Sequence, residues 1–463
     1  MLLQAAFIKD NSTALIDVEG NTLSYKDLFD FSKLFYSQIN KRTLIFIFSE
    51  NTLGSVAGYV AALETKIVPL LLNTGTEETL REALILKYQP EYFWLPESMT
   101  SEFDGEVIFK AYGYVLLKTG LNAPLLYEDL SLLLPTSGST GSPKLVRHSY
   151  NNILANARNV GKVFEITSSD RALAMLPMYY TMGLSVITSY LYGGATVLLF
   201  NGSLTDAVFW KFLKTQQATI LTGVPYSFEI LSKLRFTRMD LPDLKIITQG
   251  GGKLNPTLFN EFADYATRTG KKFIATYGQT EGTARMAYLP AEFAQSKVGS
   301  IGKAIPEGRL YLVDENGEEI TQADTPAEMV YSGPNVTLGY AFSGEDLSKN
   351  DERKGVLPTG DIAVTDADGF FYIVGRISRF LKLYGLRIGL DDIEQLILQT
   401  FGVETVCTGT DEKMKIYITN QEMIAVITDF VIQKTGLYHQ AFEVLFIPQI
   451  PRNEVGKVIY NFE

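Results

Sequence analysis

The stretch PTSGSTGSPK, residues 135–144, follows the apolar run Leu132–Leu134 and leads into the segment LVRH. It combines two glycines, several serine and threonine residues, and Lys144. Glycines let backbone N–H groups converge, hydroxyl groups donate hydrogen bonds and a lysine supplies positive charge, so this composition suits a bound phosphate. Taken alone, a loop of this composition is more often a surface turn, and these residues by themselves leave both interpretations open.

The stretch does not match the Walker phosphate loop, GxxxxGK[ST]. Gly456 and Lys457 are followed by Val458, which also breaks that pattern. The pattern predicts that the loop joins one strand (SLLL) to another (KLVRH), with a helix beginning only near Asn152. A Walker loop leads from a strand into a helix, so a site of that kind is excluded here.

The composition of the 463-residue chain is that of a globular protein, with 46% hydrophobic and 20% charged residues, and its length suggests two or three domains. A net charge of −11 disfavours nucleic acid as a partner. Cys407 is the only cysteine, which excludes an intrachain disulfide and fits the reducing cytoplasm. With only His148 and His439 as histidines, a histidine-rich metal centre is not expected.

Neither a signal peptide nor a transmembrane segment is expected. The N-terminus, MLLQAAFIKD, has no basic region before its short apolar stretch. Residues 172–205 carry no charge, but Pro177, Gly183 and the pair at 193–194 interrupt any apolar span of membrane length. This segment is predicted to be a strand, a helix at 184–192 and the strand ATVLLF.

Short apolar runs alternate with helix-period segments through most of the chain. The predicted strands are TLIFIF, KIVPLLL, ATILTGVP, KIITQGG and KFIATYG. This alternation predicts an α/β fold with largely parallel sheets, in which ligands bind beyond the carboxyl ends of the strands. The polar and glycine-rich loops of the sequence fall at those ends.

The pattern changes near Val356. GDIAVTD and FFYIVGR flank a turn at 366–369, which predicts a hairpin. We therefore predict a large α/β domain at residues 1–375 and a small α+β domain at residues 376–463. Within the small domain, Asp391 is predicted to cap a helix with Glu394 three residues on, and Gly402 to end it. The apolar face of that helix comprises Ile393, Leu396, Ile397 and Phe401.

Five motifs occur in a fixed order along the chain: TSGSTGSPK, YGQTEG (277–282), PTGD (358–361), GR (375–376) and PRNEVGK (451–457). Together they resemble the adenylate-forming superfamily of acyl-CoA synthetases, peptide-synthetase adenylation domains and luciferases. The resemblance spans nearly the whole chain. It implies a large multi-sheet α/β domain at residues 1–375 and a small mobile C-terminal α+β domain at residues 376–463. It also implies ATP-dependent activation of a carboxylate as an acyl-adenylate.

The resemblance implies roles for particular residues. It assigns the triphosphate of ATP to Ser137, Gly138, Ser139, Thr140, Gly141 and Lys144, and magnesium to Thr140 and Glu281. It assigns the remaining nucleotide contacts to Gly250, Gly251, Gly252, Tyr277, Gly278, Thr280, Asp361, Tyr372 and Arg376. A carboxylate such as Asp361 suits the ribose because it offers two acceptors to a diol. Taken outside these motifs, Glu281 would be read as a solvated carboxylate and Asp361 as a turn residue.

The resemblance implies that the catalytic residues are Thr140, Glu281, Arg376 and Lys457. Of these, Lys457 would bridge the α-phosphate and the reacting carboxylate. A flexible ammonium group suits a residue that must arrive and leave with a mobile domain. Gly385 would let a pantetheine arm pass close to the backbone. At the expected hinge the family usually has Asp or Lys, whereas this chain has Ser378.

The acyl pocket is expected around residues 177–184 and 222–228, with Tyr179, Tyr180, Gly183 and Val224 as contacts. The same tyrosines also suit an ordinary aromatic core. No aspartate is present in this uncharged region to pair a substrate ammonium group, which disfavours a free α-amino acid.

The resulting interpretation is an AMP-forming acid–thiol ligase that uses ATP, Mg²⁺ and CoA to activate a small carboxylic acid. Two alternatives stay open at this stage. One is transfer of the acyl group to a carrier-protein phosphopantetheine thiol or to an amine. The other is a nucleotide-binding module that has lost catalysis.

Overall fold

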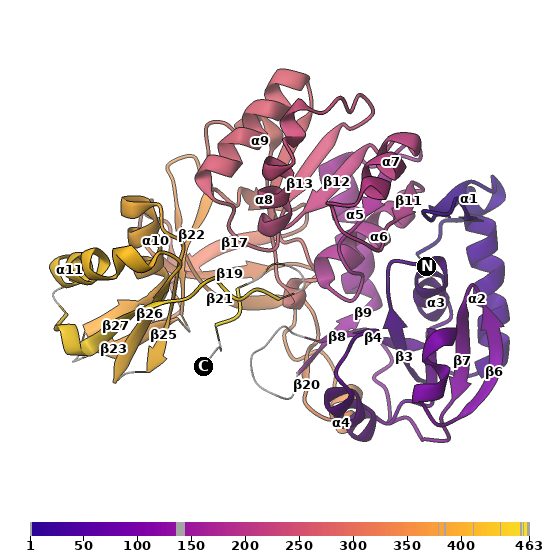
Figure 1. Cartoon of the computed structure of the whole chain (residues 1–463). Coiled ribbons are helices and arrows are strands. Elements are labelled where there is room, and N and C mark those ends of the chain that lie inside the picture. The colour runs from indigo at the N-terminus through magenta and orange to yellow at the C-terminus, as the bar shows by residue number, and fades with distance from the viewer. Residues whose placement is uncertain are drawn as a thin grey trace. The chain divides into compact units, whose positions relative to one another are not determined.

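The computed structural model (Figure 1) describes residues 2–135, 144–377, 379–383, 386–410, 412–435, 437–453, 456 and 458–460. The chain forms two compact units. The first comprises Met1–Arg309 with Tyr331–Leu357, and the second Leu310–Val330 with Pro358–Glu463. The first unit contains two large mixed sheets, and the second contains smaller sheets and two helices.

One large sheet has eight strands in the order β20-β9-β8-β4-β3-β5-β7-β6. Its central strands β8, β4, β3 and β5 are parallel, and the flanking strands β9 and β7 are antiparallel to them. The edge strands β20 and β6 pair antiparallel with β9 and β7. The strands are β3 (Leu44–Ser49), β4 (Val68–Asn73), β5 (Tyr92–Pro96), β6 (Glu106–Ala111), β7 (Tyr114–Lys118), β8 (Leu130–Pro135), β9 (Leu145–Ser149) and β20 (Gly339–Ala341).

The other large sheet has nine strands in the order β16-β15-β14-β13-β12-β10-β11-β1-β2. The strands from β14 to β1 in this order run parallel to one another. The strands are β1 (Thr13–Ile16), β2 (Thr22–Ser24), β10 (Arg171–Ala174), β11 (Thr196–Leu199), β12 (Ile220–Gly223), β13 (Ile246–Gln249), β14 (Lys272–Tyr277), β15 (Ala287–Leu289) and β16 (Lys303–Ala304).

Helices cover the faces of these sheets. Four of them share one hydrophobic cluster with both sheets: α2 (Tyr25–Ile39), α3 (Leu53–Glu64), α5 (Tyr150–Phe164) and α6 (Thr181–Tyr192). The others are α1 (Ala5–Lys9), α4 (Glu78–Tyr88), α7 (Ala207–Thr215), α8 (Pro225–Lys233) and α9 (Pro256–Thr269). Short 3-10 turns are η1 (Glu97–Glu102), η2 (Phe236–Arg238), η3 (Thr280–Gly282), η4 (Ala291–Phe293) and η5 (Gly344–Ser348).

The apolar strands are buried on both faces. Ile45 and Ile47 of β3 join the cluster that contains α3 and α6, whereas Phe46 and Phe48 join a second cluster with Tyr88 of α4. Alternate residues of a strand point to opposite faces, so a continuous hydrophobic run fills two cores at once. This explains why the central strands read as uninterrupted apolar segments in the sequence.

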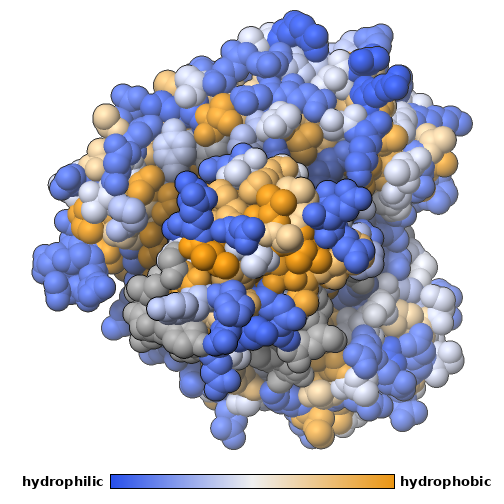
Figure 2. Space-filling model, turned by 60° about the vertical axis from the view of Figure 1, so that its left-hand side comes forward, coloured by the Kyte–Doolittle hydropathy of each residue, from blue (hydrophilic) through white to orange (hydrophobic). Residues whose placement is uncertain are grey.

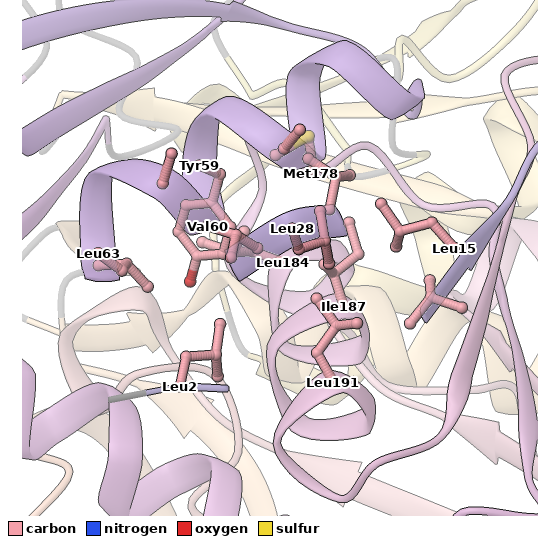
Figure 3. Close-up of a cluster of buried hydrophobic side chains, with 14 of the residues drawn as sticks. Leu2, Leu15, Leu28, Tyr59, Val60, Leu63, Met178, Leu184, Ile187 and Leu191 are labelled. Atoms are coloured by element: carbon pink, nitrogen blue, oxygen red, sulfur yellow. The ribbon is translucent and has the colours of Figure 1, made fainter. Parts of the chain in front are cut away.

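Helix α6 is anchored in the interior of the first unit. Its residues Leu184, Ile187 and Leu191 lie in a cluster with Tyr59 and Val60 of α3, as Figure 3 shows. The hydroxyl groups of Tyr59 and Thr188 are 2.9 Å apart, which adds a buried polar link between the two helices. Most of the uncharged segment 172–205 is therefore core, formed by β10, α6 and β11 as predicted, with the helix beginning three residues earlier at Thr181.

The second unit contains a five-stranded sheet in the order β18-β17-β19-β21-β22, a two-stranded sheet and a three-stranded sheet. The strands are β17 (Arg309–Val313), β18 (Glu319–Ile320), β19 (Ala327–Ser332), β21 (Val356–Thr365), β22 (Phe371–Arg376), β23 (Phe380–Leu383), β24 (Leu386–Gly389), β25 (Thr405–Thr410), β26 (Lys413–Ile418) and β27 (Phe442–Phe446). The helices are α10 (Leu390–Phe401), α11 (Ile424–Thr435) and the turns η6 (Gln421–Met423) and η7 (His439–Ala441).

The hairpin predicted around residues 366–369 is confirmed, because β21 and β22 pair antiparallel on either side of this turn. Helix α10 also ends as predicted, at Gly402 in the left-handed conformation with φ +66°. Its predicted start is wrong. The N-cap residue is Gly389, with no side-chain cap, and Asp391 lies inside the first turn.

The reason for this difference is electrostatic. Asp391 and Glu394 both pair with Arg379 instead of capping backbone N–H groups. The Nη2 atom of Arg379 lies 2.7 Å from Oε1 of Glu394 and donates to the carbonyl of Cys407 at 2.9 Å. The side chain of Arg379 is only 13% exposed, so it needs these acceptors more than an exposed helix end needs a cap.

The α/β fold, with a large multi-sheet N-terminal part and a small C-terminal part, is as expected from the sequence. The boundary between residues 375 and 376 stays a prediction. In the described part of the chain, no helix combines the length and apolarity needed to cross a membrane. Figure 2 shows a face where hydrophilic residues predominate, with a larger group of hydrophobic residues near its centre.

Candidate active site

The ends of the glycine-rich loop are fixed by a hairpin. Pro135 at the end of β8 pairs with Leu145 at the start of β9, and the two strands run antiparallel. The loop therefore connects strand to strand, as the sequence predicted. The predicted phosphate contacts Ser137, Gly138, Ser139, Thr140 and Gly141 lie outside the described residues, as do Ser378, Gly385 and Lys457.

Lys144, the first described residue after the loop, lies over an aromatic ring. Its Nζ atom is 3.7 Å from the centroid of the Tyr340 ring, and the Arg353 guanidinium lies 4.6 Å from the same centroid. The Tyr340 hydroxyl donates a hydrogen bond of 2.6 Å to Oε1 of Glu281. One tyrosine thus connects the loop lysine with the predicted magnesium ligand.

Burial and the neighbouring Glu281 carboxylate raise the pKa of Tyr340 to about 12. The phenol therefore keeps its proton at neutral pH and acts as a hydrogen-bond donor to Glu281. The quadrupole of an aromatic ring attracts cations above its face, so the Tyr340 ring stabilises the positive charges of both Lys144 and Arg353. Tyr340 and Arg353 were missed in the sequence, where they stand apart from the family motifs.

The backbone around Glu281 is held by several bonds. The carbonyl of Glu281 accepts from the backbone N–H and the side-chain hydroxyl of Thr337, at 3.0 and 2.9 Å. Arg353 donates to Thr337 Oγ1 at 2.6 Å. On the preceding residue, the carbonyl of Thr280 is 3.2 Å from Nε2 of His148, and its hydroxyl accepts from Thr181 at 2.9 Å. The carboxylate of Glu281 is therefore presented from a rigid turn.

His148 is fully buried, and burial lowers its pKa to about 4. The ring is neutral at pH 7, so Nε2 can donate to the Thr280 carbonyl. This contact links His148 to the YGQTEG motif. In the described part of the chain there is no group of three or more His, Cys, Asp or Glu side chains that could bind one.

The predicted adenine contacts lie at one edge of the nine-stranded sheet. Strands β12, β13 and β14 are parallel neighbours, and they are followed directly by Val224, by Gly250–Gly252 and by Gly278. Parallel strands bring their carboxyl ends to the same edge. The structure thus brings the predicted substrate contact Val224 and the predicted nucleotide contacts Gly250–Gly252 and Gly278 to the same edge of the sheet.

Glycine is favoured at these positions of the sheet edge because a side chain would come too close to neighbouring atoms. A Cβ atom on Gly250 would lie 2.5 Å from both Thr276 Oγ1 and Met182 Cε, and one on Gly251 would approach Val224 Cγ1 to 3.2 Å. A Cβ atom on Gly278 would lie 1.4 Å from the carbonyl oxygen of Ala284. Gly251 also has φ +78°, which favours glycine.

The predicted acyl contacts surround the start of α6. The rings of Tyr179 and Tyr180 are 4.8 Å apart, and Tyr180 is the N-cap residue of the helix. Gly183 lies in the first turn, where an added Cβ atom would be 2.3 Å from the carbonyl oxygen of Pro177. Both tyrosines are partly exposed, unlike the fully buried aromatic residues of the core.

In the second unit, Asp361 and Arg376 are paired across β21 and β22, with Arg376 Nε 2.9 Å from Asp361 Oδ1. Asp361 is buried and Arg376 is exposed. Tyr372 lies farther along the same hairpin, and its hydroxyl donates to Oδ2 of Asp366 at 3.3 Å. Two of the predicted nucleotide contacts are thus in direct contact with each other.

Comparison with known proteins gives a consistent picture. A family model described as "AMP-binding enzyme" matches residues 4–341. A 2-succinylbenzoate–CoA ligase of Bacillus cereus is 27% identical over 482 aligned residues, which cover 99% of this chain and 96% of that protein. An oxalate–CoA ligase of Arabidopsis thaliana is 29% identical over 276 residues, or 58% of this chain and 52% of that protein.

Solved structures share the fold. An O-succinylbenzoate coenzyme A synthetase of Bacillus subtilis, solved with AMP, has a TM-score of 0.78 and 23% identity, covering 98% of this chain and 97% of that one. The same enzyme has also been solved with ATP and a magnesium ion, again with a TM-score of 0.78. Because the family model matches most of the sequence, this chain belongs to the family of AMP-binding enzymes.

Proposed function

We propose that this protein is an AMP-forming acid–thiol ligase. In the first half-reaction, a carboxylate attacks the α-phosphate of ATP, forming an acyl-adenylate and releasing pyrophosphate. In the second, the thiol of CoA attacks the acyl carbonyl, forming a thioester and releasing AMP. The observation that carries this proposal is the shared sheet edge formed by Val224, Gly250–Gly252 and Gly278, next to motifs of a family that binds AMP.

The first half-reaction brings two anions together, so its transition state needs preorganised positive charge and hydrogen-bond donors. We propose that Lys144 and the loop residues Ser137, Gly138, Ser139, Thr140 and Gly141 bind the leaving pyrophosphate. Lys144 is already fixed over Tyr340 at 3.7 Å, so little reorganisation is needed.

Glu281 fits a magnesium ion bound jointly with ATP. Mg²⁺ is usually held by one or two carboxylates together with substrate phosphates and water, so a single glutamate is sufficient on the protein side. When bound there with Thr140, the ion would neutralise charge on the phosphates. Tyr340 and the bonded backbone of Glu281 fix the direction in which this carboxylate points.

We propose that Asp361 binds the ribose hydroxyls, with Arg376 and Tyr372 nearby on the same hairpin. A buried carboxylate is a strong acceptor for two hydroxyl groups. Gly250–Gly252, Tyr277, Gly278 and Thr280 are proposed to bind the adenine part of the nucleotide. Tyr179, Tyr180, Gly183 and Val224 are proposed to line the acyl pocket.

We also propose that residues 376–463 move as a mobile domain relative to residues 1–375. Lys457 would act in adenylation and leave before the thiol arrives, and Gly385 would line the path of the pantetheine arm. Ser378 lies at the proposed hinge, where the residue has only to permit backbone rotation.

The proposed acceptor is CoA. The relatives named above are CoA ligases, whereas a carrier protein has no support among them. These relatives act on different acids. The comparison therefore supports a small carboxylic acid as the substrate but not one particular acid. We propose a cytoplasmic location, because the one cysteine, Cys407, is free and buried.

The proposal is tested by incubating the protein with ATP, Mg²⁺ and a panel of carboxylic acids and measuring pyrophosphate release. Addition of CoA should then consume free thiol in step with AMP formation. A protein that binds ATP but releases no pyrophosphate with any acid would be a nucleotide-binding module instead. Thiol consumption with a phosphopantetheinylated carrier protein but not with CoA would favour the carrier alternative.

A further inference from the structure

Arg285 lies in the interior of the first unit with 2% of its surface exposed. Its Nη1 atom donates to Ser185 Oγ at 2.7 Å, and its guanidinium lies 5.2 Å from the centroid of the Phe164 ring. Nε has no hydrogen-bond partner, and no carboxylate of the described residues forms an ion pair with it. Burial lowers the pKa of this arginine to about 10.

The other buried arginines of the described residues have carboxylate partners. Arg147 pairs with Glu352 and also donates to the carbonyls of Leu338 and Tyr340. Arg81 pairs with Glu102, with Nη1 2.6 Å from Oε2. A buried charge without a partner is costly, so Arg285 stands out as a buried cation that has no carboxylate partner among the described residues.

Further polar groups close to this part of the interior also lack partners. Ser189 lies one helical turn after Ser185 on α6, and its buried hydroxyl makes no hydrogen bond within the described part of the chain. Helix α5 packs against α6 and carries Asn159, whose side-chain oxygen and nitrogen are both buried without a partner. Buried polar groups are normally satisfied, which points to a ligand that supplies the missing bonds.

The backbone of Arg285 is part of the candidate active site. The following residue, Met286, donates to the carbonyl of Tyr277 at 2.8 Å, and the preceding residue, Ala284, is in contact with Gly278. Its side chain reaches Ser185, which lies one turn beyond Thr181 at the start of α6. Arg285 therefore connects the YGQTEG motif with the helix proposed to line the acyl pocket.

From this geometry we propose that Arg285 binds a second, unreacted carboxylate of the acyl substrate, so that the enzyme selects dicarboxylic acids over monocarboxylic acids. This inference rests on the proposed function. The segment 172–205, which includes α6, carries no charged residue. Arg285 therefore places a positive charge next to this helix, at Ser185. Because Nη1 is bonded to Ser185 and Nε has no partner, the proposed bidentate carboxylate contact is made by the edge formed by Nε and Nη2.

The test uses pyrophosphate release with matched pairs of acids: hexanoate and adipate, benzoate and phthalate, and 3-phenylpropanoate and 3-(2-carboxyphenyl)propanoate. The ratio of kcat/KM between the diacid and the monoacid of each pair is the readout. The wild-type protein should prefer the diacid in at least one pair by roughly 10- to 100-fold, as expected for a charge-assisted contact. Arg285→Gln should abolish this preference, and Arg285→Lys should retain part of it.

Arg81→Gln is the matched control, because it removes a buried arginine that is already paired within the protein. The diacid preference should persist in that variant. A wild-type preference for the monoacid in every pair would overturn the inference, and so would an equal loss for both members in Arg285→Gln. The wild-type ratio decides the question even if Arg285→Gln fails to fold. Pyrophosphate release with no acid at all would refute the proposed function itself.

Discussion

Asp361 faces Arg376 across the hairpin of β21 and β22, with Arg376 Nε 2.9 Å from Asp361 Oδ1. The carboxylate is buried, whereas the side chain of Arg376 is 58% exposed. Water can therefore solvate most of the arginine but little of the aspartate. A diol that approaches Asp361 would find an acceptor that is already desolvated and oriented.

Asp361→Ala is expected to weaken ATP binding by about 1.5–3 kcal/mol, the usual range for hydrogen bonds to a charged group. Arg376 would remain solvated after the change, so the hairpin should stay folded. Isothermal titration calorimetry with ATP and Mg²⁺ measures the effect. Asp368→Ala, at the exposed turn of the same hairpin, serves as the control. Equal affinities of the Asp361→Ala variant and the wild type would exclude the ribose role.

Tyr340→Phe is expected to lower kcat/KM for ATP in the adenylation step by roughly tenfold or more, equivalent to about 1.5–3 kcal/mol. The variant keeps the ring beneath Lys144 and Arg353 but loses the hydrogen bond to Glu281. The Mg²⁺ concentration for half-maximal rate should rise as well, because the carboxylate is less well oriented.

Tyr331→Phe is the matched control for this experiment, because Tyr331 also donates from a buried phenol, to Asn335 at 2.7 Å. That change should alter stability without altering the Mg²⁺ dependence. A normal Mg²⁺ dependence in Tyr340→Phe would show that Glu281 needs no support from this hydroxyl.

The pH dependence of stability should reflect His148. Its pKa is about 4 in the folded protein, below the ordinary value of 6.5, because the ring is buried. The unfolded chain binds the proton more tightly, so the stability is present above pH 6.5 and is lost as the pH falls towards 4. His148→Gln should reduce the loss in free energy of unfolding between pH 7 and pH 4.5 by about 2–3 kcal/mol.

Chemical denaturation of the wild type and the variant at both pH values measures this difference. His439→Gln, which replaces an exposed histidine, is the control for the substitution itself. An identical acid response of His148→Gln and the wild type would show that other groups account for the effect.

Lys457 and Gly385 should separate the two half-reactions. Lys457→Ala is expected to lose pyrophosphate exchange but still to consume a supplied acyl-adenylate in the presence of CoA. Gly385→Leu is expected to keep the exchange and to lose thioester formation, because a side chain would obstruct the thiol path. Normal exchange by Lys457→Ala would contradict the role proposed for the lysine.

The proposed domain boundary predicts the outcome of limited proteolysis. Cleavage near residues 375–379 should release a large N-terminal fragment and a small C-terminal one. ATP or an acyl-adenylate analogue should change the cleavage rate, because the proposed domain motion depends on the ligand. Cleavage at other positions, unaffected by ligand, would count against a mobile domain that begins at residue 376.

The parts of the fold that depend on local patterns could be predicted from the sequence. The apolar residues of β3, β12, β13 and β14 mark these strands in the sequence, and the turn at 366–369 has the residues that a hairpin needs. The predicted cap at Asp391 failed because it considered only residues near in sequence. Arg379, twelve positions earlier in the chain, binds this carboxylate in the folded unit.

The candidate site was predicted only where its residues form motifs. Glu281 and Gly278 belong to YGQTEG, but Tyr340 is distant from both Lys144 and Glu281 in the sequence, and their contact arises only from the pairing of β9 with β20. Arg285 follows the YGQTEG motif closely, yet nothing in the sequence distinguishes a buried, unpaired arginine from a solvated one. Whether a side chain is buried and which groups it contacts depend on the tertiary structure.

The pairing of β1 with β11, in which Leu15 lies opposite Val197, has a consequence for synthesis of the protein. β1 is translated early, but its partner leaves the ribosome only much later, together with the rest of the nine-stranded sheet. Until then, one edge of an apolar strand is open to other chains. Such long-range pairing slows folding and favours aggregation of incomplete chains. Nascent chains that end before residue 196 should therefore depend on chaperones, whereas chains that extend past β11 should need them less.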